Sequence, residues 1–383
     1  MKHLRTIAEL PVKNKRVLLR VDFNTPLNKF GEIADDTRIR AALPTIQLLL
    51  SAGASLTILS HIGKSGENLS LFPAANRLSK LLGKSVLHLT LEEAQRLSPS
   101  LSAIIMVENL RNFPEEQAPS DIFAKRLATL GDFFVSDAFA TLHRDNSSIT
   151  RLPLCFPNKS AAGLLVEREV SLLQSLLTNP KRPFYCLIGG SKVSSKLAVL
   201  QSLLKCADAI FIGGAMAFTF MKAAGRATGD SPVEHELLPL AGQLLNGGVP
   251  IHLPIDFRCA TSLASSEIVV ANEIGNGLKG FDIGEATVAA FSARFKKAKT
   301  LFWNGPVGLF EDPRFDFGTR ALANALSDLK ETTTIVGGGD SVAAINSYGL
   351  ESHFSHISTG GGATLEFIES GTLLGLKPLM KKE

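Results

Sequence analysis

The sequence contains few of the residues that build disulfide frameworks or zinc sites. Only four of its 383 residues are cysteines (Cys155, Cys186, Cys206 and Cys259), and no two of them form a C-x-x-C pair. Widely spaced cysteines disfavour both kinds of site and are typical of a reducing compartment. We therefore expect the fold to depend on its hydrophobic core.

The chain also lacks a large excess of one charge and a long apolar run. Lysine and arginine number 40 against 36 aspartate and glutamate residues, which indicates neither a nucleic-acid nor a membrane partner. The longest nearly apolar stretch, Ala209 to Met221, is too short for a spanning helix, which needs about 20 residues. Residues 1–16 lack the apolar core of a signal peptide. We expect a cytoplasmic protein and, since nothing demands an oligomer, a monomer.

Short apolar runs alternate with longer amphipathic ones along the whole chain, which predicts parallel strands covered by helices. A proline-flanked stretch at 153–157, followed by a helix expected from Ala161 to Leu177, marks a domain boundary and hinge. The predicted fold class is α/β, with two doubly wound parallel-sheet domains of three αβα layers joined by a hinge helix. The expected strands are Val17–Val21, Leu56–Leu59, Ala103–Val107, Phe133–Val135, Tyr185–Ile188, Ala209–Ile212, Ile251–Leu253, Leu301–Trp303, Thr333–Val336 and His356–Ser358.

Polar and cationic residues follow every expected strand of the first half. They are Asp22 and Asn24 after the first strand, His61 to Lys64 after the second, Arg111 after the third, and Asp137, His143 and Arg144 after the fourth, with Arg38 and Arg40 opening the first helix. The carboxyl ends of parallel strands meet at one edge, so this pattern predicts a pocket for a small, multiply anionic ligand. A rim of structural salt bridges is the alternative.

Glycine turns dominate the second half. Gly337-Gly338-Gly339-Asp340-Ser341 and Gly360-Gly361-Gly362 each lie between an apolar run and a helix-compatible segment. Free N–H groups at a helix start favour an anion, and Asp340 is a hard oxygen ligand suited to Mg²⁺ beside phosphates. Either cluster alone could be a tight strand-to-helix turn. Two clusters, one with an acid, favour a phosphate site.

Three further segments fit a nucleotide. Gly189 to Lys196 is expected to start a helix, which would place Lys192 and Lys196 on one face toward a polyphosphate, although a solvated helix face is the alternative. Gly213-Gly214 ends the next strand, where an adenine or ribose could approach. Glu311 follows the turn at 302–308 and is a candidate for ribose hydroxyls, while Trp303 is expected in the core.

Together these segments closely resemble the phosphoglycerate kinase family over nearly the whole chain. The matching stretches are 20–26, 38–40 with 44–46, 108–111, 137–144, 189–196, 303–311, 337–341 and 359–363. The resemblance implies reversible phosphoryl transfer between 1,3-bisphosphoglycerate and ADP, giving 3-phosphoglycerate and ATP, by direct in-line transfer on domain closure. It also implies a phosphoglycerate-binding domain (1–160), a hinge helix (161–178), a nucleotide-binding domain that works with Mg²⁺ (179–368), and a tail returning to the first domain (369–383).

The family pattern also implies roles for individual residues. Substrate-binding residues would be Asp22, Phe23, Asn24, Arg38, His61, Ile62, Gly63, Lys64, Arg111 and Arg144. Nucleotide-binding residues would be Lys196, Gly213, Asn304, Glu311, Gly338, Gly339, Asp340 and Ser341, with Asp340 as the Mg²⁺ ligand. The catalytic groups, which stabilise the phosphoryl group in transfer, would be Arg38, Lys192 and the amides of Gly360–Gly362, Gly361 among them.

The chain departs from the family pattern in places, and two other function classes compete. Lys64-Ser65 stands where the family usually has Arg-Pro, so one phosphate contact is expected to be single rather than bidentate. Asp145-Asn146 and Leu374 also depart. One alternative is a nicotinamide-dependent dehydrogenase, but the G-x-G-x-x-G match at 275–280 lacks the helix and the acid that a dinucleotide site requires. The other is a non-catalytic nucleotide-binding module.

Overall fold

The chain forms two compact units, which we describe separately. The computed structural model describes residues 3–64, 66–97 and 104–381. Unit 1 comprises residues 1–172 and 372–383, and unit 2 comprises residues 173–371. The two ends of the chain meet within unit 1, where Leu4 and Met380 form an antiparallel bridge and the Arg5 amide donates to the Leu379 carbonyl at 3.0 Å. Ser65, Ala103 and residues 382–383, which the sequence expectations included, lie outside the described residues.

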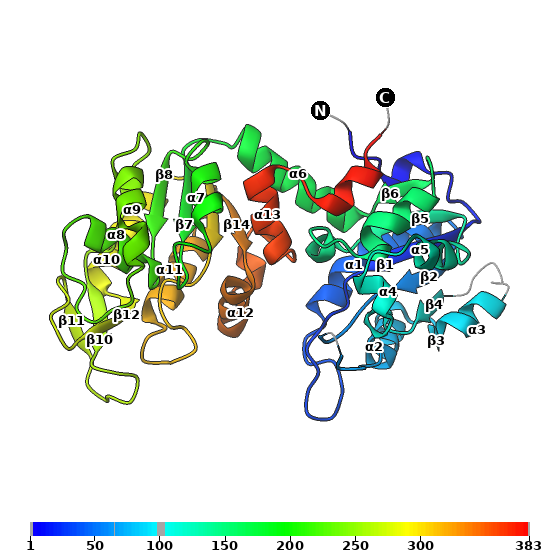
Figure 1. Ribbon diagram of the computed structural model, residues 1–383, viewed down its shortest axis with the longest axis horizontal. Helices are drawn as coiled ribbons and strands as arrows, with labels where there is room; N and C mark the ends of the chain where they lie inside the picture. The colour runs from blue at the N-terminus through cyan, green and yellow to red at the C-terminus, as the bar shows by residue number, and fades with distance from the viewer. Residues whose placement is uncertain (1–2, 65, 98–103, 382–383) are drawn as a thin grey trace. The chain divides into compact units, whose positions relative to one another are not determined.

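Unit 1 is built on a six-stranded parallel sheet (Figure 1). Its strand order is β3 (Leu87–Leu89), β4 (Ile104–Val107), β2 (Ser55–Leu59), β1 (Arg16–Val21), β5 (Phe133–Asp137) and β6 (Ser160–Ala162). The accompanying helices are α1 (Thr37–Ser51), α2 (Phe72–Leu82), α3 (Leu91–Arg96), α4 (Pro114–Gln117) and α5 (Asp121–Ala128). Helix α6 (Leu164–Thr178) begins in unit 1 and ends in unit 2. Alternate residues of β1 (Val17, Leu19 and Val21) share one core cluster with apolar residues of α1 and α2.

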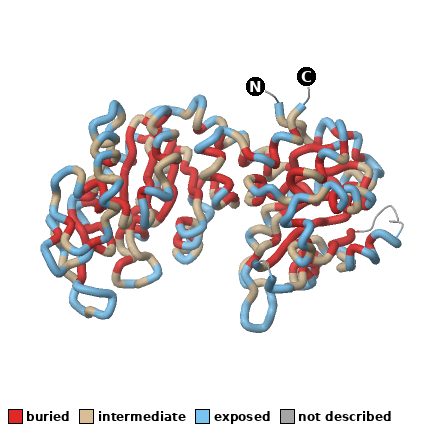
Figure 2. Tube along the Cα trace, in the orientation of Figure 1, coloured by how far each residue is buried: buried red, intermediate tan, exposed pale blue. Residues whose placement is uncertain are grey.

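Unit 2 repeats this plan with a second six-stranded parallel sheet. Its strand order is β15 (His356–Ile357), β14 (Thr333–Gly337), β13 (Thr300–Asn304), β7 (Phe184–Ile188), β8 (Ala209–Ile212) and β9 (Ile251–His252). Its helices are α7 (Leu197–Leu203), α8 (Met216–Ala223), α9 (Leu238–Leu245), α10 (Glu285–Phe295), α11 (Phe317–Ser327), α12 (Gly339–Tyr348) and α13 (Gly362–Ser370). Trp303 is fully buried, as expected, and almost every residue of the central strands β1, β2, β7 and β13 is buried (Figure 2).

All ten expected strands are present, within a residue or two of the predicted bounds. The alternation did not reveal β3 and β6, or the antiparallel sheet β11 (Val269–Ala271), β10 (Phe257–Ala260) and β12 (Lys279–Ile283). The rejected G-x-G-x-x-G match covers the turn before β12 and the first two residues of that strand, so it leads into a strand rather than a helix. No helix in the described part of the chain is long and apolar enough to cross a membrane.

The expected start of the hinge helix was wrong. Residues 160–162 form strand β6, and α6 begins only at Leu164. The carboxylate of Asp137, at the end of β5, accepts hydrogen bonds from the Leu165 and Val166 amides at 2.9 and 3.2 Å. Capping of the first amides by this carboxylate fixes the start of the helix at this point. Such a cap comes from a distant strand and leaves no mark in the local sequence.

Three loops at the carboxyl edge of the unit 2 sheet pack backbone against backbone. A Cβ atom at Gly189 would lie 2.1 Å from the Pro306 carbonyl oxygen, and one at Gly214 would lie 2.6 Å from the backbone of Gly190. Gly305 has φ +93°, and its Cβ would lie 2.2 Å from the Gly189 carbonyl oxygen. These glycines are therefore required for contact between loops, whatever ligand the loops bind.

We expect Gly189→Ala to destabilise the protein by about 1–3 kcal/mol, because the added methyl group must displace backbone rather than a flexible side chain. Gly242→Ala is the matched control, since Gly242 lies within α9 and a Cβ there meets no atom within 4 Å. The control should be neutral or stabilising by up to about 1 kcal/mol. The stabilities of the two variants are compared by thermal unfolding. Equal unfolding midpoints would contradict the packing argument.

Candidate active site

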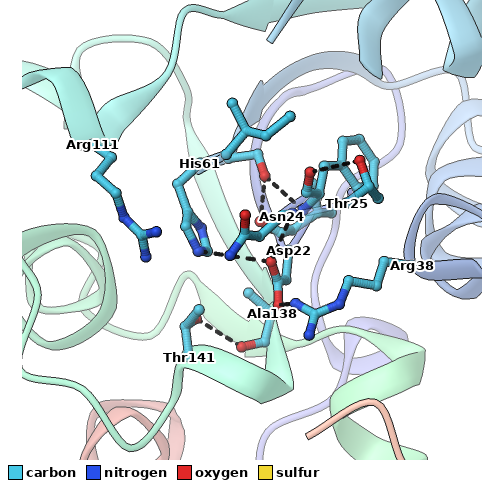
Figure 3. A network of polar contacts seen from close by, with 12 residues as sticks. Asp22, Asn24, Thr25, Arg38, His61, Arg111, Ala138 and Thr141 are labelled. Carbon is cyan, nitrogen blue, oxygen red and sulfur yellow. Dashed lines mark hydrogen bonds and ion pairs between the residues drawn. The ribbon is translucent and has the colours of Figure 1, made fainter. Parts of the chain in front are cut away.

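The polar residues that follow β1, β2, β4 and β5 gather at one edge of unit 1. Strand order reverses there between β1 and β5, and such a switch point is the usual ligand position in a doubly wound sheet. Arg38, from α1, hydrogen-bonds the Asp22 carboxylate, whose other oxygen accepts from the Asn24 amide at 3.0 Å. In the view of Figure 3, His61 and Asp22 lie between Arg38 and Arg111. We call Asp22, Asn24, Arg38, His61, Arg111 and Arg144 the unit 1 site.

A buried arginine beneath this site fixes the state of His61. Arg20 is 2% exposed, and its guanidinium lies 3.1 Å from His61 Nδ1. An arginine is always a donor, so Nδ1 must accept and the imidazole proton must sit on Nε2. Burial, with Arg20, Arg111 and Arg144 nearby, lowers the pKa of His61 to about 3, although Asp22 opposes the shift. His61 is therefore a neutral group.

Arg20 is itself held by a buried carboxylate from α4. Arg20 Nε donates to Ser148 Oγ at 2.9 Å, and this hydroxyl donates to Glu116 Oε1 at 2.5 Å. The Glu116 carboxylate lies 3.9 Å from the guanidinium and also accepts from the Ser148 amide at 2.9 Å. Sequence reasoning did not include Glu116 or Ser148 in the site. The one available signal was Arg20 itself, a charge inside an apolar strand.

The remaining predicted substrate residues differ in what they can offer a ligand. Arg111 hydrogen-bonds the Gly63 carbonyl, and burial together with Arg144 lowers the pKa of Arg111. Lys64 and Arg144 are exposed. Phe23 and Ile62 are almost completely buried, with exposures of 0% and 1%, so only their backbones could face a ligand. The unit 1 site therefore presents two arginines, Arg111 and Arg144, whose charges are little compensated nearby. This arrangement favours an anion-binding pocket over a rim of structural salt bridges.

At the carboxyl edge of unit 2, strand order reverses between β7 and β13. Lys196, which follows β7, donates to the Asn304 side chain at the end of β13, and Asn304 Nδ2 donates to the Gly337 carbonyl at 2.7 Å. Ser341 Oγ accepts from the Gly305 amide at 2.6 Å. Burial lowers the pKa of Lys196, with Asp340 close enough to oppose the shift. We call Lys192, Lys196, Asn304 and residues 337–341 the unit 2 site.

The predicted helix through Lys192 and Lys196 is wrong, because α7 begins at Leu197. Residues 191–196 form turns whose amides are captured by a side chain 40 residues away: Glu234 Oε2 accepts from the Val193 and Ser194 amides at 2.5 and 3.2 Å. Glu234 also hydrogen-bonds Ser194 Oγ, and Ser195 Oγ donates to the Lys192 carbonyl at 2.9 Å. Local bonds of this kind compete with a helix. Glu234 therefore positions the loop that carries both lysines.

The glycines of unit 2 that were predicted to contact the nucleotide or the transferring group are of two kinds. A Cβ at Gly213 would lie 2.5 Å from Val307 Cγ1, and one at Gly338 would lie 2.6 Å from Asn304 Nδ2, so packing explains both. Gly339 and Gly361 face open space, at the first residue of α12 and at the N-cap of α13. Glu311 is exposed and lies in the loop before α11.

Asp340 is the one predicted metal ligand. The described residues contain no group of three or more His, Cys, Asp or Glu side chains that could hold an ion. Mg²⁺ needs only one or two carboxylates when substrate phosphates supply other ligands. An exposed carboxylate in the first turn of α12, close to Lys196, fits that requirement.

Two doubly wound domains, each with polar side chains and turns at the carboxyl ends of its strands, define the class: a two-domain α/β enzyme. A family model described as phosphoglycerate kinase matches residues 7–371. The chain belongs to the phosphoglycerate kinase family.

Individual relatives cover almost the full chain. It is 44% identical to the phosphoglycerate kinase of Nostoc punctiforme over 395 residues, which covers 99% of this chain and 98% of that one. The identity to the enzyme of Chlamydia trachomatis is 42% over 397 residues, with 98% of each covered. The solved structure of phosphoglycerate kinase from Coxiella burnetii matches with a TM-score of 0.89 and 37% identity, covering 98% of this chain and 99% of that chain. The structure from Pyrococcus horikoshii matches with a TM-score of 0.84 and 30% identity over 98% of each chain.

These matches confirm the predicted family, fold class and kinase activity, and they make the chain a glycolytic phosphotransferase. They support neither the dehydrogenase nor the non-catalytic module.

We expect the His61 ring to stay neutral between pH 5 and 8, because protonation would place a cation against Arg20. Nitrogen-resolved NMR of the imidazole should show the Nε2–H tautomer with no titration over that range, consistent with a pKa of about 3. The unfolded chain binds this proton below about pH 6.5, so the contribution of His61 to stability should fall as the pH drops from there toward 3. A midpoint near 6 in the folded protein would contradict the assignment.

We expect Glu234→Gln to lower kcat by about tenfold or more, because a loosened loop misplaces Lys192 and Lys196. The family resemblance implies that 3-phosphoglycerate binds unit 1, so its KM should change little, since Glu234 lies in unit 2. Glu236→Gln is the matched control: this exposed neighbour removes the same charge two residues away without touching the loop. Equal kcat values for the two variants would show that Glu234 does not position the loop.

Proposed function

We propose that the unit 1 site binds 3-phosphoglycerate or 1,3-bisphosphoglycerate and that the unit 2 site binds ADP or ATP, with the phosphoryl group passing directly between them. The observation that carries this proposal is the placement of cations. Arginines stand at the switch point of one sheet, and lysines with open glycine turns stand at the switch point of the other. Each edge suits an anion, and the two belong to different units.

In unit 1, Arg38 and Asp22 would take the carboxylate and hydroxyl end of the glycerate. Arg111 and Arg144, with Lys64, would take its 3-phosphate. Since His61 is neutral, it would contribute a hydrogen bond from Nε2 rather than a charge. Phe23, Ile62 and Gly63 would contribute only backbone groups.

In unit 2, Lys196 and the turn from Gly338 to Ser341 would hold the phosphate chain, while Gly213 and Glu311 would lie along the adenosine. Asn304 keeps Lys196 in place through the contacts described above. Asp340 would hold Mg²⁺ together with phosphate oxygens of the nucleotide. The ion would neutralise charge on those oxygens.

The transfer needs no covalent enzyme intermediate, because an acyl phosphate is already reactive and catalysis consists of positioning and charge neutralisation. Arg38, Lys192 and the amides of Gly360–Gly362 would stabilise the phosphoryl group between donor and acceptor. We propose that α6 acts as the hinge that lets the domains at 1–160 and 179–368 bring the two substrates together and exclude water, with the tail at 369–383 belonging to the first domain. We further propose that the enzyme acts as a cytoplasmic monomer, in keeping with its four free cysteines.

We expect Arg38→Ala to lower kcat/KM by at least about 100-fold, through kcat, because a donor to the transferring group is lost. A coupled assay with 3-phosphoglycerate and MgATP measures this change. Arg40→Ala is the control, since Arg40 lies on the same helix but pairs with Asp36 at 2.7 Å. A rise in KM alone would mean that Arg38 only binds substrate, and no turnover in the unmodified chain would overturn the proposed function.

A further inference from the structure

A pocket lies at the amino ends of strands β7, β8 and β9 of unit 2, with a volume of about 450 Å³. Its lining comes from residues that begin or precede these strands and from the last turn of α10. The unit 2 site follows the carboxyl ends of β7, β13 and β14 in the same parallel sheet, so the pocket is at the opposite edge of that sheet. Nothing in the proposed phosphoryl transfer uses it.

The charges around this pocket do not cancel. Arg182 is ion-paired with Asp208 and donates to the Cys206 carbonyl at 3.1 Å, and the second oxygen of Asp208 accepts from the Phe184 amide at 2.7 Å. Asp208 is therefore fully engaged. Arg294, on α10, has no carboxylate within ion-pair distance among the described residues. The Arg294 guanidinium therefore remains available to bind an anionic group of a ligand.

Two aromatic rings form an apolar wall. Tyr185 and His252 both pack on Phe211: the ring centroid of Tyr185 lies 5.6 Å from that of Phe211, and the centroid of His252 lies 4.7 Å from it. The Phe211 ring in turn lies 4.8 Å from the ring of Phe295 in the core. Packing from behind holds both rings in place. Burial, with Arg294 nearby, lowers the pKa of His252, which keeps that ring neutral.

Polar atoms on this wall are also available. Neither the Tyr185 hydroxyl nor the His252 ring has a hydrogen-bond partner among the residues that the structure describes. Pro183 and Pro250, which precede β7 and β9, add flat apolar surface without further N–H donors. A mostly apolar pocket with a few convergent polar groups and one unpaired cation is the usual form of a small-molecule site.

We propose that this pocket binds a small aromatic anion, an aryl phosphate or aryl carboxylate. Its ring lies against Tyr185 and His252, and its anionic group is held by Arg294. An inorganic anion would leave the aromatic wall unused, and a neutral aromatic molecule would leave Arg294 unpaired. A ligand that carries both parts satisfies the whole pocket.

Tyrosine NMR tests this proposal directly, because the chain has only two tyrosines, Tyr185 and Tyr348. Tyr348 lies on α12, with Arg320 4.5 Å over its ring, and reports on a different part of unit 2. Full-length protein with ¹³C-labelled tyrosine is titrated with phenyl phosphate while 3-phosphoglycerate and MgADP are present. We expect the Tyr185 signal to shift saturably while that of Tyr348 stays unchanged. A shift of Tyr348 alone would place the ligand elsewhere and overturn the proposal.

The two halves of the ligand and the cation are then tested separately. Phenyl phosphate should bind at least about tenfold more tightly than inorganic phosphate or phenol, and Arg294→Gln should weaken phenyl phosphate by about tenfold while leaving phenol unchanged. Lys297→Gln is the matched control, because it removes an exposed cation from the same end of α10 that does not line the pocket. Equal losses in the two variants, or equal affinity for inorganic phosphate, would reduce the pocket to a non-specific cationic surface.

Discussion

In a parallel sheet all strands run in one direction, so every loop that follows a strand emerges at the same edge. This constraint places the candidate active site in both units. Residues between 22 and 144 meet in unit 1 because β1, β2, β4 and β5 end together, and residues between 190 and 341 meet in unit 2 for the same reason. At each switch point the loops that follow the two adjacent strands lead to opposite faces of the sheet. Backbone groups and side chains between these loops are therefore free to hold a ligand.

The two units supply positive potential by different means. Unit 1 relies on arginines supported by a buried layer, in which Glu116 holds Arg20 and Arg20 keeps His61 neutral. A buried charge is tolerated only when it is paired and hydrogen-bonded, so this layer has few alternative arrangements. Unit 2 relies on backbone turns: glycines let three loops pack tightly, and Glu234 sets the turn that bears the lysines. The site in unit 1 is thus supported by buried side chains, and the site in unit 2 by packed backbone loops together with the Glu234 side chain.

The sequence predicted what depends on local pattern. The apolar runs predicted ten strands, all of which the structure contains. The residues after these runs predicted which side chains gather at the carboxyl edge of each sheet. Contacts between distant residues could not be predicted in the same way. Glu234 and Glu116 bind residues 41 and 32 positions away, so the sequence around Val193 or Ser148 gives no sign of these contacts. The α6 cap from Asp137 is of the same kind. The strands β10 and β12 were missed because they are short and a charged residue interrupts their apolar run, Arg258 in β10 and Asp282 in β12. Several glycines assigned to a ligand proved to be required by loop packing.

The central claim is that each substrate has its own unit. Backbone amide NMR of the ²H,¹⁵N-labelled chain, titrated with 3-phosphoglycerate alone and with MgADP alone, tests it most directly. The account predicts that 3-phosphoglycerate shifts signals around Asn24, Gly63 and Arg111, and that MgADP shifts signals around Lys196 and Gly339. Both ligands shifting the same edge, with the other edge silent, would contradict it.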